Sequence, residues 1–571
     1  MAFQVSPGVN SSEINQTTTV PSIIMTAGAF VGQFNWGPVN RRVQTASEVA
    51  LVSNFGKPDN NTASSFFTAA SFLAYGNNLY IVRAANNATY NAQANTTGAN
   101  IQIQNKEIFE TSYLYNNNNN QYGAFVARYP GVMGNSLTIS VVDSASYSNT
   151  WNVNGGGLSG TFPVAPATSA QATSAGGAND QIHIVVVDSG GLFTGAKNTV
   201  LEAFPFLSKA LDGVDSLGNP SYYKTALFNN SKYVFAIDPV SYSTTNGTWG
   251  TKMANTSFAT ISTPQTLPLA NGTTATVTDG DLITAWGQFT SADAVNVSLV
   301  PTGGVSTTVQ QYVIDNISSA RTDCVAFVSP PSSAVVNQAG AEVVNIQSWW
   351  ASLARSTTYG FADTGWKYMF DKYNGIYRYV PLNGDTAGLC AYTDQIRDPW
   401  YSPAGFNRGN IKNVVRLAWS PSKPQRDTLY PLGINPVVTM QGVGTVLYGD
   451  KTMTSQPSAF DRIGVRRLFI NLETTISLAA KYSLFEFNDL FTQAQFVALV
   501  TPYLRDVKGR RGIYDFMVVC DSTNNTQAVI DSNSFVGDIY VKPARSINYI
   551  QLNFIATPTG VSFSTIVGTG Q

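Results

Sequence analysis

Short apolar runs that stop at proline constrain most strongly how this chain folds. One run covers residues 233–237 and is followed by Pro239, and a second covers residues 324–328 and is followed by Pro330. Uninterrupted apolar runs of this length suit strands that are covered on both faces, as in a mostly parallel sheet with helices outside. We therefore predict an α/β core built around such strands.

The region near the N-terminus has the pattern of a small α/β unit. An amphipathic helix at about 63–73 lies between strands expected near 23–31 and 79–83. Apolar residues recur there first at the helical period and then as a short strand-forming run, which indicates a change of element type.

The composition changes after this unit. Between Ser144 and Val187 the only formal charge is Asp180, and short apolar segments such as 137–142 alternate with turns. This pattern predicts a β-rich inserted domain, and the charge-free stretch 253–278 predicts a second insertion of the same kind.

The last hundred residues are more charged and more regular. We expect a helix at about 465–484, and a second helix that ends at Gly509 and is capped by the pair Thr492 and Gln495. Strands are expected to follow near 513–520, 535–541 and 549–556.

The charge balance excludes one class of function. The chain has 33 Lys and Arg against 34 Asp and Glu, and charged residues make up only 12% of its 571 residues. Nucleic-acid affinity comes mainly from basic side chains that neutralise phosphates, so a protein that binds polyanions by bulk charge is excluded. A surface with so little charge is poorly protected from self-association, which favours a protein that assembles.

Residue chemistry argues against catalysis. The single histidine, His183, lies in the strand-like run 182–187, and no Gly-x-Ser-x-Gly elbow accompanies it. A multi-histidine metal site is impossible, and the glycine-rich stretch 190–198 lacks the spacing of a phosphate loop, so we interpret it as a turn. No local pattern points to a carboxylate pair of the glycosidase type. We expect no catalytic residue, metal or cofactor.

The compartment follows from the cysteines and the N-terminus. Cys324, Cys390 and Cys520 are far apart and lie in or beside apolar runs, which predicts buried, reduced thiols. No basic residue precedes Arg41 and no run of 18 apolar residues occurs, so neither a secretion signal nor a membrane-spanning helix is expected. We expect a soluble protein in a reducing cytoplasm.

Each end of the chain carries an isolated strand-forming segment. Phe3 and Val5 alternate with polar residues at one end, and Val561 and Phe563 do so at the other. An isolated strand needs a sheet edge with which to pair its N–H and C=O groups. Each arm therefore pairs either with its own domain or with a neighbouring subunit, and the sequence pattern leaves both open.

A set of short motifs, in a specific order and spacing, identifies a resemblance. The motifs are SPGV at 6–9, AFVG at 29–32, YIVR at 80–83, SPAG at 402–405, GIN at 433–435, YGDKT at 448–452 and VRRL at 465–468. Through them the chain resembles the tail sheath proteins of contractile bacteriophages and related contractile injection machines over roughly 21–85 and 320–555. It departs from the family's usual Phe-Glu-Pro-Asn, which reads Phe-Glu-Phe-Asn at 485–488, and only faintly echoes the family's acidic loop at 212–215.

The resemblance implies a multidomain α/β and α+β fold. It implies a subtilisin-like α/β core without a protease site, a C-terminal α+β domain with strand-exchange arms, and β-rich inserted domains. At about 150 residues per domain the length suggests three or four domains. The expected order is an N-terminal linking arm at 1–20, a first core segment at 21–95, a β-rich inserted domain at 96–205, an α/β core at 206–450 with a second insertion near 245–310, a C-terminal sheath domain at 451–557 and a C-terminal linking arm at 558–571.

The function implied by the resemblance is mechanical. Sheath subunits form stacked hexameric rings around an inner tail tube, in a metastable extended state that contracts and drives the tube through the host envelope. The implied partners are other copies of the chain, the tail tube protein, and baseplate and tail terminator proteins. Nucleic acid and direct membrane insertion are not expected. The implied location is the virion tail, assembled in the bacterial host cytoplasm.

The resemblance also implies roles for particular residues. The arms of neighbouring subunits are expected to join a sheet of the C-terminal domain, and we separately hypothesise that a basic cluster faces the tube; ordinary solvated helix faces are the alternative reading of that cluster. The arm residues are Phe3, Val5, Val9, Val561 and Phe563, the acceptor-sheet residues are Ile539, Val541, Ile550, Leu552 and Phe554, and the tube-facing candidates are Arg462, Arg466, Arg505, Lys508, Arg510 and Arg511.

Two other functions stay open. An enzyme could use the α/β core, and a host-binding β-rich virion fibre or adhesin could use exposed Trp and Tyr of the inserted domains. The core motifs argue against host binding as the main role, and the lack of a workable catalytic set argues against an enzyme.

Overall fold

The computed structural model describes residues 26–95, 97–115, 121–148, 151–153, 155–158, 160–240 and 248–552. The described residues divide into two compact units, one within 26–482 and the other within 483–552. The two predicted terminal arms, at 1–20 and 558–571, lie outside the described residues.

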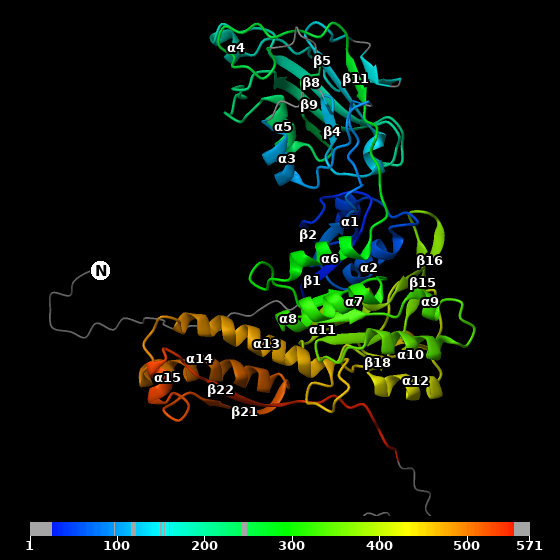
Figure 1. Cartoon of the computed structure of the whole chain (residues 1–571), viewed down its shortest axis with the longest axis vertical. Coiled ribbons are helices and arrows are strands. Elements are labelled where there is room, and N and C mark those ends of the chain that lie inside the picture. The colour runs from blue at the N-terminus through cyan, green and yellow to red at the C-terminus, as the bar shows by residue number, and fades with distance from the viewer. Residues whose placement is uncertain are drawn as a thin grey trace, which may run out of the picture. The chain divides into compact units, whose positions relative to one another are not determined.

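A seven-stranded sheet forms the core of the larger unit (Figure 1). All its neighbouring strands pair in parallel, except that β2 at one edge runs antiparallel to β3. In sheet order the strands are β18 (Ile434–Asn435), β14 (Gly360–Asp363), β13 (Val325–Val328), β12 (Leu299–Pro301), β1 (Gly28–Gln33), β3 (Leu79–Ala84) and β2 (Arg42–Thr45).

Side chains from alternate positions of these strands enter two different hydrophobic clusters. Phe30 and Phe327 pack into one cluster, whereas Val31 and Val328 pack into the other. The first cluster includes side chains of α2 (Ala63–Leu73) and α11 (Asn383–Ile396). The second cluster includes side chains of α6 (Asp279–Trp286), α7 (Thr307–Val313), α10 (Glu342–Leu353) and α12 (Lys423–Leu429).

The predicted doubly covered strand at 324–328 is confirmed as β13, and the predicted helix at 63–73 is α2. The other apolar run does not join the parallel sheet. It forms β10 (Val234–Ala236), which pairs antiparallel with β4 (Phe125–Ala127). Its side chains alternate between two hydrophobic clusters, so the predicted burial on both faces is confirmed. The apolar run does not determine whether the strand pairs in parallel or antiparallel.

The β-rich region is built on one antiparallel sheet with the order β11-β5-β8-β9. The prediction of a second insertion near 245–310 is wrong, because β11 completes the sheet of the first insertion and β12 already belongs to the core sheet. These strands are β11 (Gln265–Pro268), β5 (Leu137–Asp143), β8 (Gln181–Asp188) and β9 (Thr199–Ser208). Shorter elements of this region are α3 (Lys106–Ser112), α4 (Ala170–Ser174), α5 (Tyr223–Asn230), β6 (Asn152–Val153) and β7 (Gly156–Gly157).

A three-stranded antiparallel sheet follows the core strand β14. Its order is β16-β15-β17, with β15 (Trp366–Asp371) in the middle, β16 (Ile376–Pro381) on one side and β17 (Arg416–Leu417) on the other. The larger unit also contains α1 (Glu48–Phe55), α8 (Ser319–Arg321), α9 (Ser332–Val335), the hairpin β19 (Val437–Met440) and β20 (Gly444–Leu447), and α13 (Ile463–Ala480).

Charged side chains of β15 lie inside the protein. The Lys367 ammonium lies 2.8 Å from the Asp385 carboxylate, and both side chains are almost fully buried. The Tyr75 hydroxyl donates a hydrogen bond to the same carboxylate over 3.2 Å. Lys367 lies in β15, Asp385 lies in α11 and Tyr75 follows the end of α2, so these contacts fix the small sheet to the helices that cover the core.

In the smaller unit, α14 (Leu490–Gly509) is followed by β21 (Ile513–Val519), α15 (Gln527–Asp531) and β22 (Asp538–Pro543). Helix α14 begins one turn earlier than predicted. Its cap is Asp489, whose side chain accepts a hydrogen bond from the Thr492 backbone N–H. The predicted capping pair of Thr492 and Gln495 is therefore wrong, because both residues already lie inside the helix.

We expect Lys367→Met to lower the free energy of unfolding by about 3–5 kcal/mol, because it leaves the Asp385 carboxylate buried without its cation. Lys423→Met removes an exposed ion pair and should cost less than about 1 kcal/mol. Urea denaturation of both variants measures the difference. Equal decreases in the free energy of unfolding would show that the buried pair contributes no more to stability than the exposed pair.

Candidate assembly site

The smaller unit presents a β-hairpin with open edges. Strands β21 and β22 pair antiparallel with each other and form a sheet of only two strands within the described residues. Strand β21 packs along α14, and Figure 1 shows the hairpin running beside this helix. A two-stranded sheet is marginally stable, and each outer edge has N–H and C=O groups available for pairing.

The side chains of the hairpin alternate between two environments. Phe516, Val518, Ile539 and Val541 are half-buried and form opposed cross-strand pairs. Met517 and Tyr540 form the intervening pair and are exposed. This exposed pair was not among the predicted site residues. The signal for it is that 513–519 carries apolar residues at both odd and even positions, which places apolar side chains on both faces of a strand.

The structure separates the predicted acceptor residues into two groups. Ile539 and Val541 lie in β22, as the acceptor role requires. Ile550 and Leu552 belong to no strand and are exposed, so the expected strand at 549–556 is absent over its described part, 549–552. Alternating side chains alone do not make a strand, because the backbone still needs a partner. Phe554 and the arm residues Phe3, Val5, Val9, Val561 and Phe563 lie outside the described residues.

Four of the predicted basic residues lie together at the end of α14. Arg505, Lys508, Arg510 and Arg511 are all exposed there. Lys508 pairs with Asp515 over 2.9 Å, and Arg510 contacts Asp506 over 3.5 Å. Exposed ion pairs of this kind contribute little binding energy. The four basic side chains therefore make the surface at the end of the helix positively charged.

The other two basic candidates belong to the larger unit. Arg466 is only 5% exposed, and its guanidinium lies 3.9 Å from the ring centroid of Phe460 and 4.3 Å from that of Tyr359. Arg462 is half-buried and contacts the Asp450 carboxylate over 3.3 Å. Both guanidinium groups are thus engaged inside their own unit, and the basic surface reduces to the four residues in and just after the last turn of α14.

A polar cluster at the ends of the core strands offers no accessible nucleophile. The Ser329 hydroxyl donates to the Asp363 carboxyl over 2.8 Å and accepts from the Asn383 side chain over 3.0 Å. All three side chains are almost fully buried. His183 lies in β8, where its Nδ1 accepts from the Phe206 backbone N–H, so it cannot serve as a base for Ser329.

The glycine-rich turn after β8 is confirmed as structural. The Asp188 carboxylate accepts hydrogen bonds from the backbone N–H groups of Gly191, Phe193 and Thr194. These are the groups with which a phosphate loop would hold its ligand, and here the protein's own carboxylate occupies them.

The remaining chemical predictions concern cysteines, metals and membranes. All three cysteines are buried and free, as predicted. Throughout the described part of the chain, no cluster of three or more His, Cys, Asp or Glu side chains has the arrangement of a metal site. None of the helices described there is both long enough and apolar enough to cross a bilayer.

Comparisons with known proteins agree on one family. Three family models match the chain: the phage tail sheath Gp18 domain III N-terminal region at 28–84, the phage tail sheath central domain at 275–453 and the phage tail sheath C-terminal domain at 455–557. The chain is 35% identical to the tail sheath protein of Vibrio phage KVP40, over 99% of this chain and 100% of that protein. It is 33% identical to the tail sheath protein of Enterobacteria phage T4, over 99% of both.

Solved structures show a similar fold. The sheath tail protein of Listeria innocua aligns with a TM-score of 0.53 at 11% identity, over 92% of this chain and 96% of that one. The sheath tail protein of Desulfitobacterium hafniense aligns with a TM-score of 0.52 at 10% identity, over 91% and 94% of the two chains. Their likeness supports a mixed α/β architecture with several sheets.

The polar cluster predicts a pH dependence of stability. Burial raises the pKa of Asp363 to about 8, so the native state binds a proton that the unfolded chain releases above about pH 4. The contribution of Asp363 to stability is therefore full at acid pH and is lost as the pH rises toward 8. In Asp363→Asn, the loss of stability between pH 5 and pH 8 should be smaller than in the parent, as measured by urea midpoints. An equal loss in both proteins would contradict this assignment.

Proposed function

Because the chain belongs to the family of contractile phage tail sheath proteins, we propose that it assembles as stacked hexameric rings around an inner tube and drives that tube through the host envelope. As a member of this family it is a structural, non-enzymatic subunit of a contractile sheath in the virion tail, and it works as a helical multimer. The observation that carries the proposal is the similarity to tail sheath proteins along 99% of the chain.

We propose that the open hairpin of the smaller unit is the joint between subunits. Its acceptor residues are Ile539 and Val541, and the incoming strands are the arms that contain Phe3, Val5 and Val9 at one end of the chain and Val561 and Phe563 at the other. The unpaired edges of β21 and β22 support this role, because an added strand satisfies their backbone groups.

The segment that follows β22 suggests a revised boundary for the C-terminal arm. Residues 544–552 carry exposed Ile547, Tyr549, Ile550 and Leu552, and the last two alternate with Gln551. We therefore assign Ile550, Leu552 and Phe554 to the donated strand and not to the acceptor sheet. The arm then begins near 544 and is long enough to leave its own unit.

The strength of one arm contact determines when the sheath forms. Four ladder hydrogen bonds at about 1 kcal/mol each and two or three buried side chains at about 2 kcal/mol each sum to about 8–10 kcal/mol. This is comparable to the estimated cost of association, which is about 4–15 kcal/mol. One contact alone therefore binds weakly, and subunits remain separate until a tube and a baseplate gather several contacts. Assembly of this kind takes place in the host cytoplasm.

The directional contact determines the shape of the polymer. An arm that leaves one subunit and enters the sheet of another is a head-to-tail contact, which extends as a helix unless the rotation closes a ring. The arms then act as tethers while rigid bodies move between an extended and a contracted packing. The doubly covered parallel sheet is consistent with the subtilisin-like core proposed for the larger unit.

We propose that the positive end of α14 faces the inner tube. Arg505, Lys508, Arg510 and Arg511 provide a screened attraction that has no fixed partner geometry. Such an attraction guides assembly onto a tube and still permits the sheath to move along it. The tail terminator and baseplate proteins are the proposed partners at the two ends.

Chains that lack residues 1–20 or 544–571 should stay folded but form no ordered cylinders on a tail tube. Electron microscopy scores the cylinders, and circular dichroism verifies the fold. A chain that lacks only 568–571, beyond the alternating apolar residues, is the matched control and should assemble normally. Ordered cylinders from both long truncations would overturn the strand-exchange proposal.

The joint reversal Arg505→Glu, Lys508→Glu and Arg511→Glu should reduce tube-templated assembly, and added salt should weaken assembly of the parent protein as well. The control reverses three exposed lysines of the inserted region, Lys197, Lys232 and Lys252, which changes the net charge equally. If both triple variants assemble like the parent, α14 does not face the tube.

A further inference from the structure

The small sheet of the larger unit displays an aromatic surface. On the outer side of β15 and β16, Tyr368 pairs with Tyr379 and Phe370 pairs with Tyr377 across the strands. Their ring centroids lie 4.7 Å and 5.2 Å apart, respectively, and Tyr368 also stacks on Tyr377 at 5.4 Å. Arg416 of β17 lies over Tyr368 at 4.7 Å. We call these five residues the aromatic platform.

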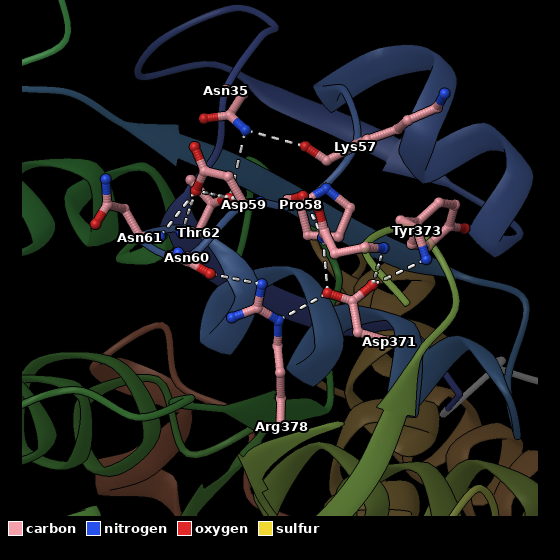
Figure 2. A network of polar contacts seen from close by, with 11 residues as sticks. Asn35, Lys57, Pro58, Asp59, Asn60, Asn61, Thr62, Asp371, Tyr373 and Arg378 are labelled. Carbon is pink, nitrogen blue, oxygen red and sulfur yellow. Dashed lines mark hydrogen bonds and ion pairs between the residues drawn. The ribbon is translucent and has the colours of Figure 1, made fainter. Parts of the chain in front are cut away.

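The platform is rigid because the turn that joins its two long strands is held on both sides. Figure 2 shows Arg378 placed between the Asp371 carboxylate and Asn60, with bonds of 2.7 Å and 2.8 Å. The Asn374 amide adds a bond to the Pro58 carbonyl over 2.9 Å. The loop before α2 thus clamps the hairpin, so a partner that docks there does not have to order it first.

The platform remains available in the single chain. Phe370 is 48% exposed and Tyr377 is 51% exposed, although both rings are large and apolar. Arg416 is exposed and donates to the Tyr379 hydroxyl over 2.9 Å, but no ion pair with a carboxylate is found for it among the described residues. A complementary partner would therefore present apolar or aromatic groups next to a negative charge.

A loop of the smaller unit has this complementary chemistry. Between α13 and α14, Phe485 and Phe487 are almost completely exposed, and Leu490 and Phe491 continue the apolar surface. Glu486 lies between the two phenylalanines and is also exposed, with no ion pair among the described residues. Phe485 adopts a left-handed backbone with φ of 69°, which is unusual for an aromatic residue and indicates a defined loop.

We propose that this loop of one copy docks on the aromatic platform of a second copy. Phe485 and Phe487 pack on the platform rings, and the Glu486 carboxylate pairs with the Arg416 guanidinium. The occupant is a second copy because one chain carries both halves of the contact, each exposed and each with the charge that the other lacks. The inference rests on the proposed helical assembly and adds a second head-to-tail contact that is independent of the arms.

Reciprocal charge reversal tests the contact. Glu486→Arg or Arg416→Glu alone should raise the protein concentration needed for polymerisation on tubes about tenfold, because each variant places like charges together. The double variant should return close to the parent value. The matched controls Glu110→Arg and Lys423→Glu reverse exposed charges elsewhere and should have no effect.

A mixture of the two single variants distinguishes a contact between copies from one within a chain. When the two variants alternate along the polymer, the loop of the Glu486→Arg variant meets the platform of the Arg416→Glu variant, and the unchanged loop meets the unchanged platform. The mixture should therefore polymerise better than either variant alone. Recovery in the double variant but not in the mixture would overturn the proposal, as would normal polymerisation of both single variants. The parent protein is measured in parallel, and its failure to form cylinders would instead count against the proposed sheath function.

Discussion

Unsatisfied backbone hydrogen bonds at the edges of one small sheet are the constraint on which the rest of this molecule depends. Within the described residues, strands β21 and β22 have no other strand partner than each other, whereas every inner strand of the core sheet has two. A two-stranded sheet with open edges gains stability when further strands join it. Sheaths of the family to which the chain belongs contain many copies of one subunit. At these edges a single chain leaves backbone N–H and C=O groups that a further strand can pair with.

The two units differ in how completely each one buries its apolar surface. The larger unit has a parallel sheet that is covered on both faces, and charged groups such as Lys367 and Asp385 are paired inside it. In the described part of the smaller unit, α14 packs against a two-stranded sheet and many apolar side chains are exposed. A well-packed larger unit and a smaller unit with exposed apolar side chains and open strand edges suit the proposed lattice. In that lattice the larger units move relative to one another while the strand-exchange contacts persist.

The sequence predicted those features that depend on local pattern. Helix α2 and strand β13 lie where the apolar periodicity placed them, and the thiols are buried as expected. Local sequence pattern did not predict strand direction or sheet membership where segments distant in the sequence pair with each other. The run at 233–237 has the composition of a parallel strand but pairs antiparallel, and β11 joins a sheet whose other strands come more than fifty residues earlier. Arg466, which the sequence predicted to face the tube, is buried against the rings of Phe460 and Tyr359, and these neighbours are distant in the sequence or hidden in the pattern.

The most direct test of the account is a density map of the assembled cylinder at a resolution that traces the main chain around β21 and β22. The account predicts that the added strands beside this hairpin belong to the N-terminal and C-terminal arms of neighbouring copies. A map in which both arms fold back on the hairpin of their own chain, with adjacent copies touching only through side chains, would contradict it.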